Sequence, residues 1–180
     1  MRKRVLCILG EGFEEIETIT PIDLLRRAGV DVVLASVNGD SLVMGRSNII
    51  VQTEIALSRL QVADFDLLLL PGGPGVTGLR KEGRAATLAK EFHAAEKLVA
   101  AICAAPTILQ DAGLLEGKRF TAHSSVHAEL PAALGEERVV QDGKIITSRG
   151  AGTALDFGLA LVAELCGPEK RDEIAQAIMA

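Results

Sequence analysis

The sequence predicts a doubly wound α/β fold, in which helices cover both faces of a mostly parallel sheet. Strand-like runs alternate along the chain with helix-like runs, as in proteins built from βα units. The central strand-like runs, such as Leu67–Leu70, are continuously apolar, which is typical of parallel strands buried on both faces. No linker, repeat or low-complexity segment interrupts the sequence, so we expect residues 1–180 to form a single domain.

Strands are expected wherever short apolar runs are bounded by turn residues. The first run follows a basic cluster and ends at Gly10, so it is too short for a signal peptide and suits a buried strand. The last two runs flank Asp142-Gly143, a strong hairpin signal. The expected strands are Arg4–Leu9, Asp31–Val37, Ser41–Met44, Asn48–Thr53, Leu67–Leu70, Leu98–Ile102, Arg119–Thr121, Glu137–Gln141 and Lys144–Ser148.

Helices are expected in most of the intervening segments. The first carries apolar residues at helical spacing, among them Ile16 and Ile19, and Gly29 marks its C-terminal end. Pro106 suits a first helical turn, where a missing N–H costs little. The expected helices are Glu14–Ala28, Arg84–Ala95, Ala104–Ala112, Gly152–Cys166 and Pro168–Met179.

The composition argues against several classes of protein. Aromatic residues make up 3% of the chain and the formal net charge is -5, so a nucleic-acid-binding surface is not expected. The longest apolar stretch, Leu98–Leu109, is too short to cross a bilayer, which takes about 20 residues. The three cysteines form no Cys-x-x-Cys pair, so we expect neither a disulfide framework nor a metal site, and a cytoplasmic location fits best.

One segment places a cysteine directly between a buried strand and a helix. In Leu98-Val-Ala-Ala-Ile-Cys103-Ala-Ala-Pro106 the small neighbours of Cys103 permit a sharp turn like a nucleophile elbow. We expect the helix N-terminus to lower the pKa of Cys103 and to favour its thiolate. The alternative is a small buried residue that ends a strand.

The loop after the first expected strand is rich in glutamate. If Ile16 and Ile19 face the sheet, a neighbouring acid such as Glu17 points into the crevice beyond the strand ends. Beside a thiolate this carboxyl group is expected to be protonated, because a like charge raises its pKa, and to donate a hydrogen bond to sulfur. The alternative is that these acids only complement the positive end of a helix.

The loop Leu70–Gly78 is rich in glycine. Adjacent glycines, Gly72 and Gly73, let backbone N–H groups turn toward an anion, which indicates an oxyanion hole. The spacing Gly73-x-Gly75-x-x-Gly78 also matches a dinucleotide-binding pattern, but it lies in mid-chain and Pro74 interrupts it. We therefore expect no nucleotide cofactor.

A histidine follows the strand expected at Arg119–Thr121. His123 is placed to act as a base or an acid near Cys103. A capping or core histidine is the alternative for this position.

Together these segments resemble the ThiJ/PfpI superfamily and, more narrowly, its DJ-one (Parkinsonism-associated deglycase) branch. The resemblance runs in order and at matching spacing along nearly the whole chain. The motifs that carry it are Gly12-Phe-Glu-Glu-Ile-Glu17-Thr, Leu70-Pro-Gly-Gly73, Ala100-Ala-Ile-Cys103-Ala-Ala-Pro and Thr147-Ser-Arg-Gly-Ala-Gly-Thr.

The resemblance implies a flavodoxin-like sandwich that forms a homodimer. It implies Cys103 as the reactive nucleophile and Glu17 as its protonated partner. It also implies that the N–H groups of Gly73 and Ala104 bind an oxyanion, beside the expectation for Gly72.

Two further residues and two departures follow from the same resemblance. His123 matches a histidine near the cysteine, and Arg46 matches an arginine at the dimer contact. Ala104 stands where the PfpI protease branch has histidine, so proteolysis is not expected. Ala101-Ile-Cys103-Ala-Ala lacks the Gly-x-Cys-x-Gly pattern of amidotransferases.

Three functions are compatible with these residues. The first is a glyoxalase or deglycase without a cofactor, in which Cys103 attacks methylglyoxal or its adduct on a thiol or amine. The second is a redox-responsive protective protein or chaperone whose Cys103 oxidises to the sulfinic acid. The third is a ThiJ-type member labelled with thiamine biosynthesis but with another activity.

Overall fold

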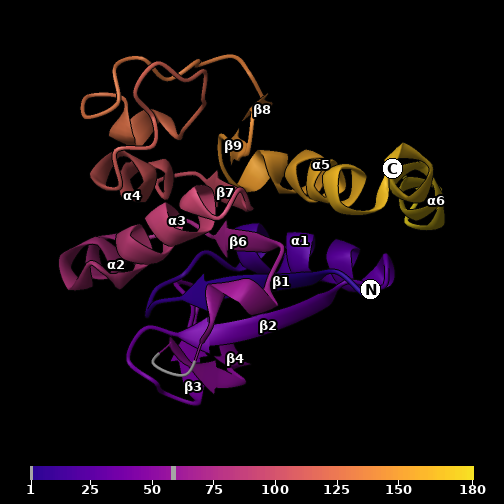
Figure 1. Ribbon diagram of the computed structural model, residues 1–180, viewed down its shortest axis with the longest axis horizontal. Coiled ribbons are helices and arrows are strands. Elements are labelled where there is room, and N and C mark those ends of the chain that lie inside the picture. Colours follow the sequence, from indigo (N-terminus) through magenta and orange to yellow (C-terminus); the bar gives the residue numbers. More distant parts are fainter. Residues whose placement is uncertain (1, 58–59) are drawn as a thin grey trace.

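The computed structural model describes residues 2–57 and 60–180, and a seven-stranded sheet lies at its centre (Figure 1). The strands of this sheet are β1 (Arg4–Leu9), β2 (Asp31–Ser36), β5 (Ile55–Ala56), β6 (Leu67–Leu70), β7 (Leu98–Ile102), β8 (Val139–Asp142) and β9 (Ile145–Ser148). Their order is β5-β2-β1-β6-β7-β9-β8, with every pair parallel except β8 with β9. The remaining strands, β3 (Leu42–Met44) and β4 (Ile50–Gln52), form an antiparallel hairpin.

Helices cover both faces of the sheet. They are α1 (Glu15–Arg27), α2 (Val76–Glu82), α3 (Arg84–Ala94), α4 (Pro106–Asp111), α5 (Ala154–Cys166) and α6 (Pro168–Ala177). Helices α2, α3 and α4 pack on one face, and α1, α5 and α6 pack on the other. In β6, Leu68 and Leu70 point to the first face while Leu67 and Leu69 point to the second, which explains the continuous apolar run. The predicted doubly wound, mostly parallel fold is confirmed.

Three elements differ from the sequence-based expectation. Helix α2 and the short strand β5 were not expected. Little in the sequence indicated α2, because this helix directly follows the glycine-rich loop and contains Gly78. The expected strand Arg119–Thr121 is wrong. The N–H of Thr121 donates to the side chain of Thr147 at 2.9 Å, so the segment lies near β9 without forming a backbone ladder.

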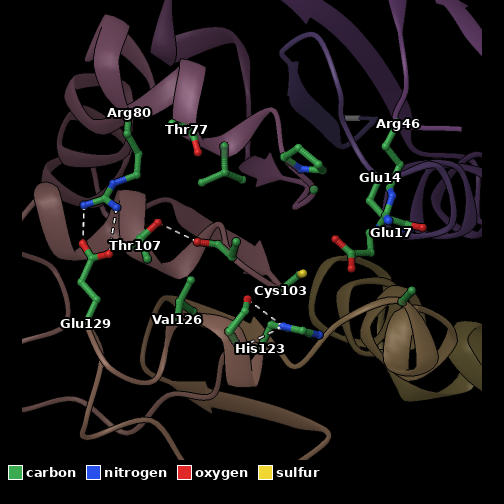
Figure 2. A pocket seen from close by; sticks show the side chains of 16 residues that line it. Glu14, Glu17, Arg46, Thr77, Arg80, Cys103, Thr107, His123, Val126 and Glu129 are labelled. Carbon is green, nitrogen blue, oxygen red and sulfur yellow. Dashed lines mark hydrogen bonds and ion pairs between the residues drawn. The ribbon is translucent and has the colours of Figure 1, made fainter. Parts of the chain in front are cut away.

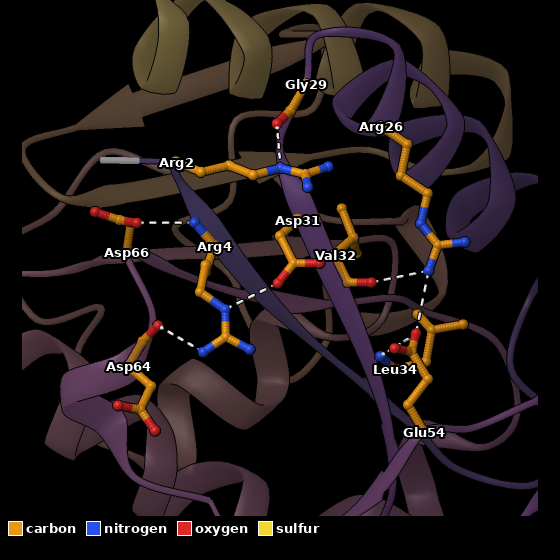
Figure 3. Close-up of polar contacts among 10 residues, drawn as sticks. All are labelled: Arg2, Arg4, Arg26, Gly29, Asp31, Val32, Leu34, Glu54, Asp64 and Asp66. Carbon is orange, nitrogen blue, oxygen red and sulfur yellow. Dashed lines mark hydrogen bonds and ion pairs between the residues drawn. The ribbon is translucent and has the colours of Figure 1, made fainter.

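Ion pairs join the amino ends of the strands, at the edge opposite the loops that follow them (Figure 3). Arg4 pairs with Asp31 at 2.9 Å, and Arg26 pairs with Glu54 at 3.1 Å. These side chains are about half exposed, so each pair contributes about 0–1 kcal/mol. The basic residues Lys3, Arg4 and Arg26 are therefore partly exposed and paired with acids.

Candidate functional site

Three loops meet at the carboxyl ends of the neighbouring strands β1, β6 and β7. They form one wall of a pocket of about 490 Å³, whose other side is formed by the segment after His123 (Figure 2). Cys103, Glu17 and Gly73 all line this pocket. The structure thus brings the sequence-predicted loops together where a doubly wound sheet binds its ligands.

Cys103 occupies a sharp and crowded turn. Its φ is +67°, in the left-handed region, which costs a residue with a side chain about 1–3 kcal/mol. The turn is held by two hydrogen bonds of 2.9 Å, from the Cys103 N–H to Ser148 O and from the His123 N–H to Cys103 O. A Cβ on Gly72 would lie 2.5 Å from Cys103 Cβ, so only glycine fits beside the turn. The half-buried thiol is thereby held in the pocket.

Glu17 lies beside Cys103 and is only 1% exposed. Its Oε2 accepts the Gly72 N–H at 3.1 Å, and its carboxylate also accepts the Ala151 N–H and the Cys103 thiol. Burial raises the pKa of Glu17 to about 7, the hydrogen bonds oppose this rise, and the charge of Glu14 adds to it. This carboxyl group therefore exchanges its proton near neutral pH.

The inward direction of Glu17 was predicted for the wrong reason. Ile16 and Ile19 do not face the sheet, because they are 54% and 42% exposed on the outer face of α1. Glu14 instead sets the first turn of the helix, since its Oε2 caps the Glu17 N–H at 2.8 Å. This turn directs Glu17 and Thr18 toward the interior.

The expected lowering of the pKa of Cys103 is also wrong. Burial and then the charge of Glu17 raise the pKa of this thiol to about 12. The N–H groups of Gly73 and Ala104 bind the sulfur and oppose the rise without cancelling it. Helix α4 begins only at Pro106, so its dipole does not outweigh the neighbouring carboxylate. Above about pH 7 the pair of Cys103 and Glu17 therefore holds one proton, and at lower pH it takes up a second.

The N–H groups expected to bind an oxyanion divide into two sets. Those of Gly73 and Ala104 are directed at the sulfur of Cys103. That of Gly72 donates to Glu17 and is therefore not available to a substrate, which corrects the expectation for this residue. Gly73 has a φ of +99°, and a Cβ there would lie 2.6 Å from the Glu14 nitrogen.

His123 and Arg46 both line the pocket. His123 lies beside Cys103 in Figure 2 and accepts a hydrogen bond from the Ser125 N–H at 3.2 Å through Nδ1. Arg46 is exposed, follows the β3 strand and lies beside Glu14, and its N–H donates to Phe13 O at 2.9 Å. The expected dimer-contact residue therefore also belongs to the wall of the pocket.

Two site residues were missed although they lie in a quoted motif. The Ala151 N–H binds Glu17, and a Cβ on Gly150 would lie 3.2 Å from His123 Cδ2 and 4.0 Å from Cys103 Sγ. Both residues follow β9, whose carboxyl end adjoins that of β7. The signal that could have identified them is this position at a strand end.

A cluster of charges forms the far wall of the pocket. Arg80 on α2 makes two hydrogen bonds to Asp111 of α4, at 2.7 and 2.9 Å. It also binds both carboxylate oxygens of Glu129, which lies in the irregular segment after His123. Arg80 thus ties the two helices that follow the site loops to the segment that carries the histidine. Figure 2 shows its contact with Glu129.

Comparison with known proteins places this chain in a family. The family model described as DJ-1/PfpI matches residues 3–164. The chain belongs to the DJ-1/PfpI family. The match confirms the resemblance seen in the sequence. The branch called DJ-one above is the one that the names of the relatives write as DJ-1.

Relatives of the DJ-1/PfpI family match almost the whole chain. Protein dj-1beta of Drosophila melanogaster is 37% identical over 99% of this chain and 98% of its own length. The Parkinson disease protein 7 homolog of Danio rerio is 36% identical over 93% of this chain and 92% of its own. The crystal structure of Drosophila melanogaster DJ-1beta superposes with a TM-score of 0.95, covering 100% of this chain and 99% of that one.

No group of three or more His, Cys, Asp or Glu side chains among residues 2–57 and 60–180 is arranged to hold a metal ion. Within the same ranges, no helix has the length and apolar character needed to span a membrane.

Proposed function

We propose that this chain is a glyoxalase or deglycase that uses Cys103 and no cofactor, and that acts on methylglyoxal or on its thiol and amine adducts. The observation that carries this function is the pair of Cys103 and Glu17. The thiol donates to a buried carboxylate whose pKa of about 7 lets it take up and return a proton at neutral pH. Membership of the DJ-1/PfpI family is consistent with such chemistry.

The first step is attack of sulfur on the aldehyde carbon. The Sγ–C bond forms as the thiol proton of Cys103 passes to Glu17, so a thiolate faces a protonated acid at the moment of attack. The carbonyl electron pair moves to oxygen. The N–H groups of Gly73 and Ala104, which are directed at the sulfur, would bind this oxygen in the proposed step. Glu17 then returns the proton to this oxygen and a hemithioacetal results.

The remaining steps need only acid–base chemistry. A base in the site removes the proton from the carbon bonded to sulfur, and a proton is added at the neighbouring carbonyl carbon. The aldehyde carbon is thereby oxidised and its neighbour reduced, so no external oxidant is required. Water hydrolyses the resulting thioester to lactate and frees Cys103. With an adduct, the C–S or C–N bond breaks first and the hydroxyl proton passes to the leaving thiol or amine. Cys103 then attacks the aldehyde that this releases.

Turnover by the purified protein tests this function. Methylglyoxal should disappear and lactate should accumulate with the wild-type chain and with Cys166→Ser, a matched control at the end of α5. Cys103→Ser should reduce the rate at least 100-fold, because the nucleophile is lost. Equal rates in Cys103→Ser and wild type would reject the function.

A redox-responsive protective role or chaperone role is the second candidate. The half-exposed sulfur of Cys103 lies against two N–H donors that would also bind the oxygens of a sulfinic acid. Toxoplasma gondii DJ-1, 36% identical, has been solved in an oxidised form. Mild peroxide should add two oxygens to Cys103, as read by peptide mass mapping. Oxidation found only at methionine residues would contradict the redox-responsive role. The described residues offer nothing that favours the thiamine-biosynthesis alternative.

We also propose that the chain forms a homodimer. An apolar patch lies on α1 and on the β3–β4 hairpin, which the bridge between Phe13 and Gly45 joins to the start of α1. Each member is at least 42% exposed, and together they are Ile16, Ile19, Leu42, Met44, Ile49 and Ile50. Light scattering should report a dimer for wild type and for the control Lys90→Glu, and a monomer for Ile50→Glu. A monomeric wild type would refute the proposal.

A further inference from the structure

The loop that carries His123 determines where the ring proton of this histidine lies. Nδ1 accepts the backbone N–H of Ser125 at 3.2 Å, and the Ser125 hydroxyl lies 2.9 Å from the same nitrogen. A backbone N–H can only donate, so Nδ1 must present its lone pair to it. A neutral imidazole has one ring proton, which therefore sits on Nε2.

The surroundings keep the ring in this orientation. The backbone of His123 is tied to the elbow by its N–H bond to Cys103 O at 2.9 Å, and the Val126 N–H binds His123 O at 3.0 Å. On the Cδ2 side, which is also the side of Nε2, the ring approaches Gly150. A Cβ there would lie 3.2 Å from Cδ2 and 4.0 Å from Cys103 Sγ. The edge opposite Ser125 and the reacting sulfur therefore both border Gly150.

We propose that His123 serves the reaction as a hydrogen-bond donor through Nε2–H, that Ser125 is the positioning residue that fixes this tautomer, and that Glu17 alone carries the transferred proton. This inference rests on the proposed function of the site. It assigns distinct tasks to the two titratable groups that lie beside Cys103.

The chemistry of the ring explains the division of tasks. With its proton on Nε2, the neutral imidazole has no lone pair there and cannot act as a base toward the substrate. If it gave that proton to the alkoxide, Nδ1 would also lack a proton and the ring would become an anion. His123 therefore stabilises the alkoxide that forms when Cys103 attacks, while the thiol proton moves to Glu17 and then to the alkoxide oxygen.

The tautomer can be measured directly on the reduced wild-type protein. Nitrogen-15 NMR of histidine-labelled protein should show His123 with an unprotonated Nδ1 and a protonated Nε2. Ser125→Ala should move the Nδ1 resonance because one of its two contacts is removed. Ser124→Ala is the matched control and should leave it in place, since the Ser124 side chain makes no hydrogen bond to a described residue. A protonated Nδ1 in wild type would overturn the inference.

Activity variants separate hydrogen bonding from proton transfer. His123→Ala should lower kcat/KM about 100- to 1000-fold, the usual effect of losing one donor to an oxyanion. His123→Gln should stay within about tenfold of wild type, because its amide donates a hydrogen bond but transfers no proton. Glu17→Gln should lose about 100- to 10,000-fold although His123 is intact.

Two results would separate the failure of this inference from the failure of the proposed function. If His123→Gln is as impaired as His123→Ala while wild type turns over methylglyoxal, the function stands and the donor role is refuted. If wild type turns over no aldehyde, the proposed function and the donor role in it are both refuted. The NMR spectrum still decides the tautomer that Ser125 was proposed to fix.

Discussion

Removing the charge of Glu17 is expected to lower the pKa of the Cys103 thiol. Burial is the largest cause that raises this pKa to about 12, and the charge of Glu17 is the next. Because the thiol hydrogen-bonds to the carboxylate, thiolate and carboxylate charges would lie about 4 Å apart, which costs about 4 kcal/mol at an effective dielectric constant of 20. This energy corresponds to about three pKa units. That figure is an upper limit, because burial is the larger cause and remains in the variant. Glu17→Gln should therefore lower the pKa of Cys103 but leave it above the ordinary value of 9.

The assay is an ultraviolet titration of thiolate absorbance in wild type and in Glu17→Gln. The same titration of Cys103→Ser supplies the background from Cys7 and Cys166. Cys7 is fully buried on β1, and burial raises the pKa of both background thiols, so their contribution should be small. An unchanged or higher pKa of Cys103 in Glu17→Gln would refute the reasoning, because it would mean that Glu17 does not oppose the thiolate.

Three further predictions concern stability. Burial raises the pKa of Glu17 from 4.5 to about 7, so its contribution to the free energy of unfolding is fully present below pH 4.5 and is lost as the pH rises through 7. In wild type the free energy of unfolding in urea should be about 3 kcal/mol lower at pH 8 than at pH 4.5 on account of this group, and Glu17→Gln should abolish that difference. The same pH dependence in Glu17→Gln and wild type would contradict the prediction. Gly72→Ala should lower the free energy of unfolding by at least about 1–3 kcal/mol, because the new Cβ would lie 2.4 Å from Glu17 Oε2. Gly78→Ala on α2 is the control, because its Cβ meets nothing within 4 Å and should not destabilise the fold. Equal melting temperatures for these two variants would reject the crowding argument. Arg80→Met should cost about 1 kcal/mol and speed hydrogen exchange around Glu129, and unchanged exchange there would show that the ion pairs do not hold the segment.

The elements predicted best from the sequence are those whose residue pattern fits only one type of secondary structure. Strands β1, β6 and β7 match the expected ranges because four or five consecutive apolar residues bounded by turns fit a strand covered on both faces. Cys103 was found by the same logic, since it lies where the apolar strand changes into a helix. The segment 119–121 failed because its extended backbone binds a side chain rather than a neighbouring strand.

What the sequence could not provide was the balance of electrostatic effects. A helix N-terminus favours a thiolate, but burial and the adjacent carboxylate oppose it more strongly here, and both depend on tertiary packing. Glu17 was assigned correctly to the interior although Ile16 and Ile19 lie outside, because Glu14 caps the helix in a way that hydrophobic spacing does not reveal. Ala151 contributes only its backbone N–H, so its side chain gave no signal.

The most direct test of the central claim is whether Cys103 forms a covalent intermediate during turnover. Protein mixed rapidly with methylglyoxal and quenched in acid should carry the mass of one aldehyde on the peptide that contains Cys103, before lactate reaches its steady-state rate. The adduct should be absent from Cys103→Ser and should persist longer in Glu17→Gln, because proton return is slowed. Lactate formation at the wild-type rate without any adduct on Cys103 would contradict a reaction that proceeds through this sulfur.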